Sequence, residues 1–412
     1  MNRIRSAGRQ TFRSLETPNY RKYLVGQIVS ASGSWVQQTA LTWLVVRMTH
    51  GNGLAVGTVV ALQFLPVLLG GAWAGVLADR LDKRRLLMAT SAGAAVCAAV
   101  MGALVLSGSI ELWMVYALAA SFGIATALDS PARRSFVTEL VPDRHAANAV
   151  SLNSSVFTAA RVIGPTVAAL LIATVGIGWC FIANAASFVA VIAALMMMDL
   201  RTINPVAPMP RQPGQLKDGL RYVWAHQALR TTLLLTAIIG TLSFNFQVTV
   251  SLMARKVFHG DATTFATLMA LMSAGAVISS LYVAHRERVT TRFVILAALM
   301  LGGCMMIAAA TPSIVVFAIV LVPMGASSIG FLSSAGALAQ SRADPAFRGR
   351  VAALFAVAFL GSTPIGAPII GAVSQVFGPR SGLIVGGITA LVAGGLALRA
   401  LNERTAAASV PA

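Results

Sequence analysis

Twelve continuous apolar runs, spread along the whole 412-residue chain, limit what this sequence can fold into more than any other feature. A helix needs about 20 mainly apolar residues to cross a bilayer, and backbone groups in lipid must bond within their own segment. Each run is therefore predicted to be a membrane-spanning α-helix. The runs cover residues 23–46, 55–77, 86–106, 112–128, 147–174, 180–198, 231–253, 263–284, 293–310, 313–338, 351–376 and 383–398. Prolines inside four of them are expected to kink or locally open the helix, namely Pro66, Pro165, Pro323, Pro364 and Pro368.

The composition excludes most other classes of protein. Hydrophobic residues make up 57% of the chain and charged residues 11%, whereas soluble domains carry about 25% charged residues. This balance excludes a soluble globular protein, a disordered chain and a disulfide-rich secreted module. Strands of an outer-membrane barrel alternate over segments of about 10 residues, so the continuous runs exclude that class too. The predicted fold class is all-α integral membrane, with 12 transmembrane helices.

The basic residues fall almost entirely on one side of the predicted membrane. Of the 31 Lys and Arg residues, 26 lie in the two termini and in every second loop, and four lie in the opposite loops. Because cytoplasmic loops are rich in Lys and Arg, we expect both termini in the cytoplasm and the protein in the inner or plasma membrane. This asymmetry also accounts for the net charge of +18, so nucleic acid is not expected as a partner.

The longest connection divides the chain into two halves. We predict an N-terminal six-helix bundle over residues 1–198, a cytoplasmic linker over 199–230 and a C-terminal six-helix bundle over 231–412. The linker holds four prolines and then an amphipathic stretch at 216–228, which is typical of an interfacial helix.

The two halves repeat one another in sequence. A shift of 209 residues aligns the first run with the seventh, pairing Ser34 with Ser243, Gln38 with Gln247, Thr42 with Ser251, Arg47 with Lys256, and His50-Gly51 with His259-Gly260. Parallel repeats of this kind are found in transporters that bind substrate near the membrane midplane and alternate its exposure. The repeat therefore indicates a transporter.

The loop between the second and third runs carries the most specific motif. It reads GVLADRLDKRRLL over residues 75–87. It resembles the loop between helices two and three of the major facilitator superfamily, whose pattern is G-x-L-a-D-r-x-G-r-[KR]-x-x-[LI], with Asp82 in place of the second glycine. The resemblance implies that superfamily's fold of two pseudo-symmetric six-helix bundles.

The same resemblance implies a gating motif. In it, Asp79 would cap helix eleven and pair with nearby basic residues, and Asp129 matches an acid that joins this network in the family's exporters. The motif residues are Gly75, Asp79, Arg80, Lys83, Arg84 and Asp129. A carboxylate at a helix N-terminus meets the positive end of the helix dipole, which supports the role of Asp79. The alternative is that the basic residues only anchor the topology.

The region after the fourth run resembles the branch of exporters that contains the enterobactin exporter and related drug-efflux proteins. The resemblance lies in residues 129–134, 139–142, 148–153 and 160–165. Superfamily exporters often carry g-x-x-x-G-P-x-x-G-G in helix five, and this chain keeps Gly164-Pro165 but has alanine at three of the glycines. We expect a kink at Gly164 and Pro165, either as part of the transport machinery or as plain packing.

Arg161 is the one charge that we expect deep inside a span. It lies about 21 Å along the fifth run at 1.5 Å per residue. The acids Glu111 and Asp129 are expected only at the ends of the fourth run, so Arg161 has no predicted buried counter-ion. We expect it to line a central cavity and attract an anionic or polar substrate. The alternative is that it binds backbone carbonyls or water.

Amide side chains in the spans are the remaining candidates for the cavity. These are Gln37, Gln38, Asn153, Asn245 and Gln247. Such amides either bind a polar ligand or hold helices together by hydrogen bonds. The repeat relates Gln38 to Gln247, which favours these two for the cavity.

Together these features predict a secondary active transporter. We expect it to export a small organic molecule, a drug-like compound or a siderophore that is anionic or neutral, in exchange for protons. The alternatives are a proton-coupled uptake symporter and a non-transporting receptor or scaffold. No phosphate-binding G-x-x-x-x-G-K-[ST] loop and no clustered His or Cys occur, so we expect no enzyme activity, cofactor or metal. The expected partners are the substrate, protons and lipid, and the expected state is a monomer.

Overall fold

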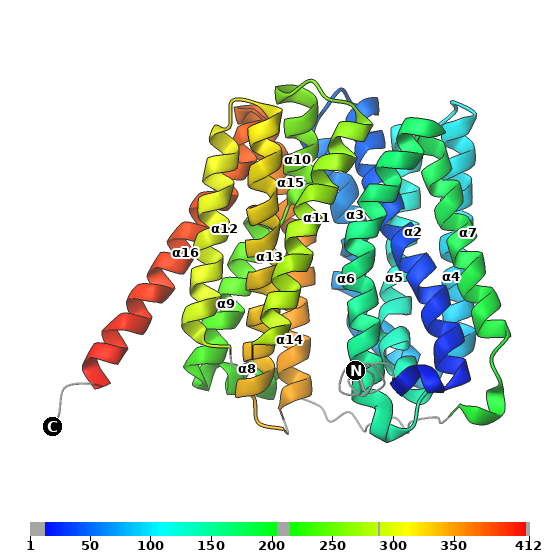
Figure 1. The fold of residues 1–412 in the computed structure, drawn as a ribbon, viewed down its shortest axis with the longest axis horizontal. Helices are drawn as coiled ribbons and strands as arrows, with labels where there is room; N and C mark the ends of the chain where they lie inside the picture. The colour runs from blue at the N-terminus through cyan, green and yellow to red at the C-terminus, as the bar shows by residue number, and fades with distance from the viewer. Residues whose placement is uncertain (1–12, 204–214, 287–288, 346, 409–412) are drawn as a thin grey trace, which may run out of the picture. The chain divides into compact units, whose positions relative to one another are not determined.

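The computed structural model describes residues 13–203, 215–286, 289–345 and 347–408, and the side chain of Asp79 lies outside what it describes. All the regular elements of these residues are helices (Figure 1). The first half contains the short 3-10 helix η1 (Arg13–Glu16) and then α2 (Pro18–Met48), α3 (Gly53–Arg80), α4 (Lys83–Leu106), α5 (Leu112–Glu139), α6 (Asp143–Thr174) and α7 (Ile177–Met196). The second half contains α8 (Gln215–Ala225), α9 (Gln227–Leu242), α10 (Phe246–Leu252), the π-helical turn η3 (Met253–Val257), α11 (Ala262–His285), α12 (Thr291–Ala310), α13 (Ile314–Arg342), α14 (Arg348–Leu360), α15 (Thr363–Phe377) and α16 (Pro379–Ala408).

The twelve predicted spans all lie in these helices. By length and hydropathy, 11 segments of the described residues qualify as membrane spans, and α9 to η3 and α14 to α15 each count as one. The predicted span that falls outside this set lies in α2, which has 31 residues. This helix carries many polar side chains, among them Gln27, Ser30, Gln37 and Gln38. With α2 included, the predicted number of 12 is recovered.

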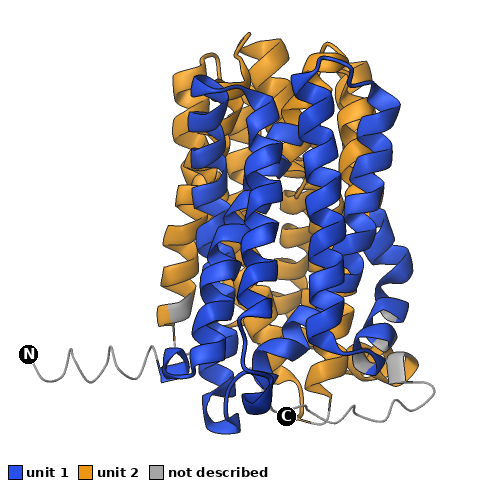
Figure 2. Cartoon of the chain, turned by 90° about the vertical axis from the view of Figure 1, so that its right-hand side faces the viewer, with its two compact units in different colours: residues 1–41, 65–210 blue, residues 42–64, 211–412 orange. Residues whose placement is uncertain are grey.

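The chain forms two compact units (Figure 2). The first unit contains residues 1–41 and 65–210, and the second contains residues 42–64 and 211–412. The division passes through α2 and α3, so the ends of these helices that flank the turn at residues 49–52 pack with the second half of the sequence.

Two spans of the second unit are interrupted. The eleventh span breaks between α14 and α15, immediately before Pro364, as the proline predicts. The seventh span breaks at residues 243–245, between α9 and α10, where the sequence has no proline. The two breaks lie against each other, because a Cβ on Gly366 would be 1.7 Å from the Thr241 carbonyl oxygen. By contrast, Pro66, Pro165, Pro323 and Pro368 lie within continuous helices.

The internal repeat is visible in the backbone. His50 and His259, which the 209-residue shift aligns, have φ angles of 51° and 52° and are the non-glycine residues with positive φ in the described chain. Each turn is closed by the amide of the following glycine, with Gly51 donating to Val46 O at 2.8 Å and Gly260 to Ala254 O at 2.7 Å. Residues in the left-handed conformation, followed by such a hydrogen bond, commonly end helices. The first span of each half therefore ends with the same kind of turn.

Asp261 is the N-cap residue of α11, and its side chain stabilises the start of that helix. Its carboxylate accepts from the Thr264 backbone N–H and hydroxyl, each at 2.8 Å. The backbone hydrogen bond from Thr264 is the main reason that the pKa of Asp261 is lowered from 3.8. The ionised carboxylate therefore stabilises the folded protein above about pH 3.8, and this contribution is lost as the pH falls through the lowered folded-state pKa.

We predict that Asp261→Ala lowers the free energy of unfolding by about 1 kcal/mol at pH 7, the usual cost of losing an N-cap. The loss should shrink towards zero as the pH falls through the lowered pKa of Asp261, because the wild-type cap is then protonated. Thermal unfolding of the purified protein in detergent at several pH values measures this difference. Asp261→Asn keeps an acceptor and is the control. A difference between Asp261→Ala and wild type that does not change with pH would contradict the assignment.

Candidate functional site

A cavity of about 610 Å³ lies inside the first unit, between α2, α4, α5, α6 and α7. Aromatic rings and small polar side chains share its wall. The rings are Trp35, Phe122, Phe157 and Phe188, and the polar groups include Gln27, Ser30, Ser34, Thr90, Ser91, Thr126, Asp129, Arg133, Arg134, Asn153 and Ser154. A mixed wall of this kind is typical of small-molecule sites, where a few polar groups orient a mainly apolar ligand.

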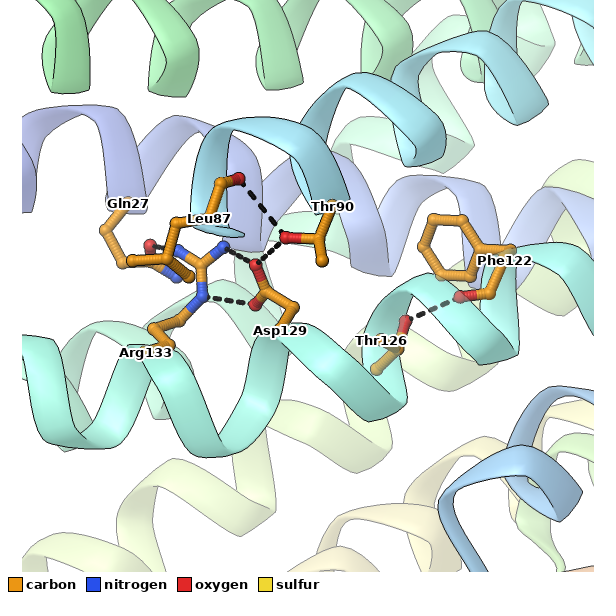
Figure 3. Close-up of polar contacts among 7 residues, drawn as sticks. All are labelled: Gln27, Leu87, Thr90, Phe122, Thr126, Asp129 and Arg133. Atoms are coloured by element: carbon orange, nitrogen blue, oxygen red, sulfur yellow. Dashed lines mark hydrogen bonds and ion pairs between the residues drawn. The ribbon is translucent and has the colours of Figure 1, made fainter. Parts of the chain in front are cut away.

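A buried ion pair forms one side of this cavity (Figure 3). Asp129 and Arg133 are one helical turn apart on α5, and the guanidinium contacts both carboxylate oxygens, Nε to Oδ2 at 2.5 Å and Nη2 to Oδ1 at 2.8 Å. The third guanidinium nitrogen, Nη1, donates to the side-chain oxygen of Gln27 on α2. The Thr90 hydroxyl on α4 lies 3.1 Å from Asp129 Oδ1 and 3.2 Å from the Leu87 carbonyl. The pair therefore connects three helices through polar contacts.

The burial of this pair determines how much free energy of unfolding is lost when one of its partners is removed. The Arg133 side chain is 8% exposed and the Asp129 side chain 19% exposed. A buried pair of this kind contributes little net stability, but removal of one partner leaves an uncompensated charge that costs several kcal/mol. The two charges thus tolerate burial only together.

The structure corrects the predicted end of the helix that carries Asp129. We expected the fourth span to end at Leu128, with Asp129 at the rim and Arg133 in the loop. Instead, α5 continues through Pro131 to Glu139. The predicted end of the helix was therefore wrong, whereas the placement of Asp129 at the rim of the membrane stays a prediction. The i,i+4 spacing of Asp129 and Arg133 is the signal that would have shown the longer helix, since opposite charges at that spacing meet on a helix and neutralise each other.

The basic residues of the gating motif bind within the first unit. Lys83, the first residue of α4, forms an ion pair with Glu139 at the end of α5. Arg84 donates from Nε to the Leu195 carbonyl at 2.7 Å and from Nη2 to the Met196 carbonyl at 3.3 Å, which satisfies carbonyls at the C-terminus of α7. Asp82 caps α4 by accepting from the Arg85 N–H at 2.7 Å.

The other motif residues are less connected. Gly75 lies on α3, and Arg80 is the exposed last residue of that helix. The predicted cap of helix eleven by Asp79 concerns a side chain outside the described residues, so it stays a prediction. Asp129 lies ten residues before Glu139, about 15 Å along the helix, and it contacts Arg133 and Thr90.

Arg161 contacts an aromatic ring of the cavity wall. Its guanidinium carbon lies 4.9 Å from the ring centre of Trp35, which is within the range of a cation–π interaction. One turn further along α6, a Cβ on Gly164 would be 2.2 Å from the Trp35 Cβ, so the glycine allows α6 to approach α2 closely. Pro165 follows it and is buried. Gly164 and Pro165 therefore set the position of Trp35 relative to Arg161.

The predicted amides fall into two groups. Gln37 accepts from Asn184 Nδ2 at 2.7 Å, a hydrogen bond between α2 and α7, and Gln38 is half-buried on α2. The others have buried polar atoms for which the described residues supply no partner, namely Asn153 Oδ1, Asn245 Oδ1 and both amide atoms of Gln247. Buried polar atoms without a partner are rare, and they point to a bound ligand or water. Asn153 lines the cavity of the first unit, and the other two lie at the break before α10 in the second.

Comparison with known proteins relates the chain to transporters. A family model described as "transmembrane secretion effector" matches residues 9–411. The multidrug efflux pump Tap of Mycobacterium tuberculosis is 26% identical over 403 residues, covering 92% of this chain and 93% of that protein. The macrolide efflux protein A of Streptococcus pyogenes is 23% identical over 87% of this chain and 89% of its own length.

A third relative matches over a shorter region. The staphyloferrin A transporter of Staphylococcus aureus is 28% identical over 251 residues, which cover 60% of this chain and 62% of that protein. Among solved structures, a mutant of the peptide transporter POT aligns with a TM-score of 0.74 at 12% identity, over 94% of this chain and 95% of that one. A mutant of the nucleoside transporter NupG aligns with a TM-score of 0.71 at 13% identity, over 92% and 99%. These likenesses show that the fold is that of major facilitator transporters.

The burial of Asp129 and Arg133 leads to a prediction about the free energy of unfolding. We expect Asp129→Leu or Arg133→Met alone to lower the free energy of unfolding by about 3–5 kcal/mol, because each leaves one buried charge without its partner. The double variant should recover most of this loss. Unfolding of the purified protein in denaturant measures the three values.

The exposed pair of Arg399 and Glu403 is the matched control. It has the same i,i+4 spacing, a distance of 3.9 Å, and side chains that are 81% and 72% exposed. Arg399→Gln should cost at most a few tenths of a kcal/mol. Single variants of the buried pair that cost no more than this control would show that burial does not govern the pair.

Proposed function

Because the chain belongs to the transmembrane secretion effector family of the major facilitator superfamily, we propose that it exports a small organic molecule by alternating access, in exchange for protons. The coarse function, transport of small molecules across a membrane, is shared by its relatives, which include multidrug and macrolide efflux proteins. The exchange for protons, the substrate and the orientation are our proposals.

The observation that carries the proton proposal is the Asp129–Arg133 pair in the wall of a cavity of about 610 Å³. An ionised Asp129 neutralises Arg133 and accepts from Thr90, so it holds α4 and α5 together. A proton on Asp129 removes the negative charge that neutralises Arg133 and weakens the acceptor for Thr90, while the contact of Arg133 with Gln27 remains. The two protonation states therefore favour different packing of α2, α4 and α5, which is what coupling to a conformational change requires.

Competition for one carboxylate supports exchange rather than co-transport. Hydroxyl groups of a substrate in the cavity would donate hydrogen bonds to the ionised form of Asp129. The same carboxylate cannot hold the proton at that moment. Substrate and proton then occupy Asp129 in turn.

The charge around the cavity supports a neutral or anionic substrate. Arg134 lines the cavity, and the Arg161 guanidinium lies over the ring of Trp35, which forms part of the wall. Asp129 is neutralised by Arg133 when ionised, so the cavity offers no free negative charge to a cationic drug. The aromatic residues Phe122, Phe157 and Phe188 provide surfaces for the apolar part of the substrate.

We further propose how the chain sits and moves. The charge asymmetry of the sequence supports cytoplasmic termini and a plasma-membrane location. The halves at residues 1–198 and 231–412, joined by the linker at 199–230, are proposed to rock about the substrate, as in other transporters with parallel repeats.

The first test identifies a substrate and then measures whether its transport is coupled to proton movement. A thermal-shift screen of the purified protein with catecholate siderophores, macrolides and cationic dyes selects a ligand. In proteoliposomes, efflux of that ligand should rise with a proton gradient and stop when the gradient is collapsed. A flat response to the gradient would contradict proton exchange. Ligand uptake along with protons would instead support a symporter.

The second test assigns the proton to Asp129. We predict that Asp129→Asn lowers gradient-driven efflux about tenfold or more, because the amide cannot take up a proton. Exchange of labelled for unlabelled ligand, which needs no net proton movement, should persist. Glu403→Gln removes an exposed carboxylate and should leave both rates unchanged. Gradient-driven efflux by Asp129→Asn at the wild-type rate would exclude Asp129 as the proton carrier.

The third test concerns Arg161. If it attracts the substrate, Arg161→Ala should weaken the apparent affinity for an anionic ligand about tenfold, and Arg161→Lys should keep most of it, because both lysine and arginine place a cation over the ring. A neutral ligand should be affected less. Transport measured against ligand concentration gives these values. Unchanged affinity for every ligand would remove Arg161 from the site.

A further inference from the structure

The short helix α8, which precedes the seventh span, is packed onto the second unit along one of its sides. Gly219 and Val223 are one turn apart and buried on that side, and α8 contacts α9 and α14 (Figure 1). A Cβ on Gly219 would be 3.0 Å from the Arg350 Cβ, so α8 and α14 approach closely there. Val223 belongs to a small buried cluster with Leu229 of α9 and Val351 of α14. Packing therefore sets the rotation of α8 about its own axis.

Tyr222 fixes α8 in this orientation. Its hydroxyl donates to Asp344 Oδ2 and accepts from the Asp344 backbone N–H, each at 3.0 Å. Its ring stacks on Phe347, with 4.2 Å between the ring centres and an angle of 6° between the planes. The Arg350 guanidinium carbon lies 5.0 Å from the centre of the same Phe347 ring. These contacts join α8 to the connection between α13 and α14, so the remaining side of α8 points in a fixed direction.

The remaining side of α8 separates apolar from charged side chains. Leu220 and Trp224 are one turn apart, and they are 44% and 49% exposed. At 3.6 residues per turn, Lys217 and Arg221 follow them on the surface of the helix, and both are exposed. Asp218 lies about 140° round the helix from the middle of the apolar pair. A surface that receives the apolar pair therefore also meets both cations, while the acid points away from it.

This side of α8 lies close to the start of a membrane span. His226 alone separates Ala225, the last residue of α8, from Gln227, where the span of α9 to η3 begins. Trp224 is three residues before that span, which is at most about 11 Å of extended chain. Tryptophan is enriched at membrane interfaces, because its ring is apolar and its N–H is polar. The position of Trp224 in the sequence therefore corresponds to the headgroup layer.

The charge around α8 favours an anionic surface. Among the described residues, α8 and the connection at 342–350 carry five basic and two acidic side chains. These are Lys217, Arg221, Arg342, Arg348 and Arg350, with Asp218 and Asp344. Asp344 is bound to Tyr222, so its carboxylate faces α8 and contributes less outside. Each Lys or Arg near an anionic membrane surface strengthens binding by about fivefold.

We propose that the remaining side of α8 is a binding surface for the anionic phospholipids of the bilayer. Leu220 and Trp224 insert among the acyl chains, and Lys217 and Arg221 bind the phosphate groups. A helix with an apolar stripe beside cations lies in a membrane interface in this way. The inference needs only a chain that spans a membrane, so it does not depend on export or on proton exchange.

The test compares fluorescent labels on two sides of α8. After the three native cysteines are replaced, Leu220→Cys carries a label at the proposed lipid contact. Ala225→Cys carries it on the exposed surface about 120° away, and both leave every charge in place. The full chain is reconstituted in nanodiscs of phosphatidylcholine, alone or mixed with phosphatidylglycerol. Quenching by lipids with brominated acyl chains gives the ratio of inserted to non-inserted label.

We expect phosphatidylglycerol to raise this ratio about twentyfold for the label at position 220, because each of the two cations contributes about fivefold. The label at position 225 should stay unquenched in both lipids. Lys217→Gln combined with Arg221→Gln should abolish the increase. Arg399→Gln removes an exposed cation on α16 and should preserve the increase.

Three results would each overturn the proposal. The first is a label at position 220 that is quenched equally with and without phosphatidylglycerol. The second is an undiminished increase in the variant that lacks Lys217 and Arg221. The third is a label at position 220 that is not quenched in either lipid, because a protein surface would then cover α8 in place of the bilayer. The measurement uses neither substrate nor a proton gradient, so its outcome is separate from that of the proposed function.

Discussion

A charged group inside a bilayer must find its opposite within the protein, and in the first unit this requirement is met by Asp129 and Arg133. The pair is formed on one helix, but its remaining hydrogen-bonding capacity is filled from two others, by Gln27 and Thr90. The same contacts that make burial tolerable thus connect α2, α4 and α5. A site that binds a polar molecule or a proton here acts directly on the packing of three helices.

In the second unit, the notable features are two interrupted spans and uncharged polar groups. Its two interrupted spans leave polar backbone and amide groups near Asn245 and Gln247, and α15 approaches α9 closely at Gly366, which has no side chain. This close contact lies next to backbone that has lost its regular hydrogen bonds. This combination of a tight contact and weak points is suited to movement between a small number of states.

The sequence predicted the parts of this protein that follow from hydropathy and repetition. The twelve spans agree with the structure because they depend on local hydropathy, and the predicted alignment of His50 with His259 is matched by a left-handed turn at each residue. The length of α5 was missed, because a count of charges marks Asp129 and Arg133 as a loop when they neutralise each other on one helix face. The break before α10 was also missed, because it arises from packing against Gly366 and carries no proline.

The sequence identified several residues of the candidate site, but it did not show which of them lie together. Arg161, Asn153 and Asp129 were each selected; Asp129 and Asn153 line the cavity, whereas Arg161 contacts it only through the ring of Trp35. Lys83 was predicted as a basic residue of the gating motif, and the structure adds its partner Glu139, which the longer α5 brings to the start of α4.

The internal neutrality of the Asp129–Arg133 pair has a consequence for energetics in a living cell. A group without net charge can change its depth in the membrane without electrical work, whereas a single positive charge gains or loses about 2.3 kcal/mol for each 100 mV that it crosses. In the proposed cycle, only the form with a proton on Asp129 carries that charge. The membrane voltage would therefore act on one leg of that proposed cycle and leave the other untouched.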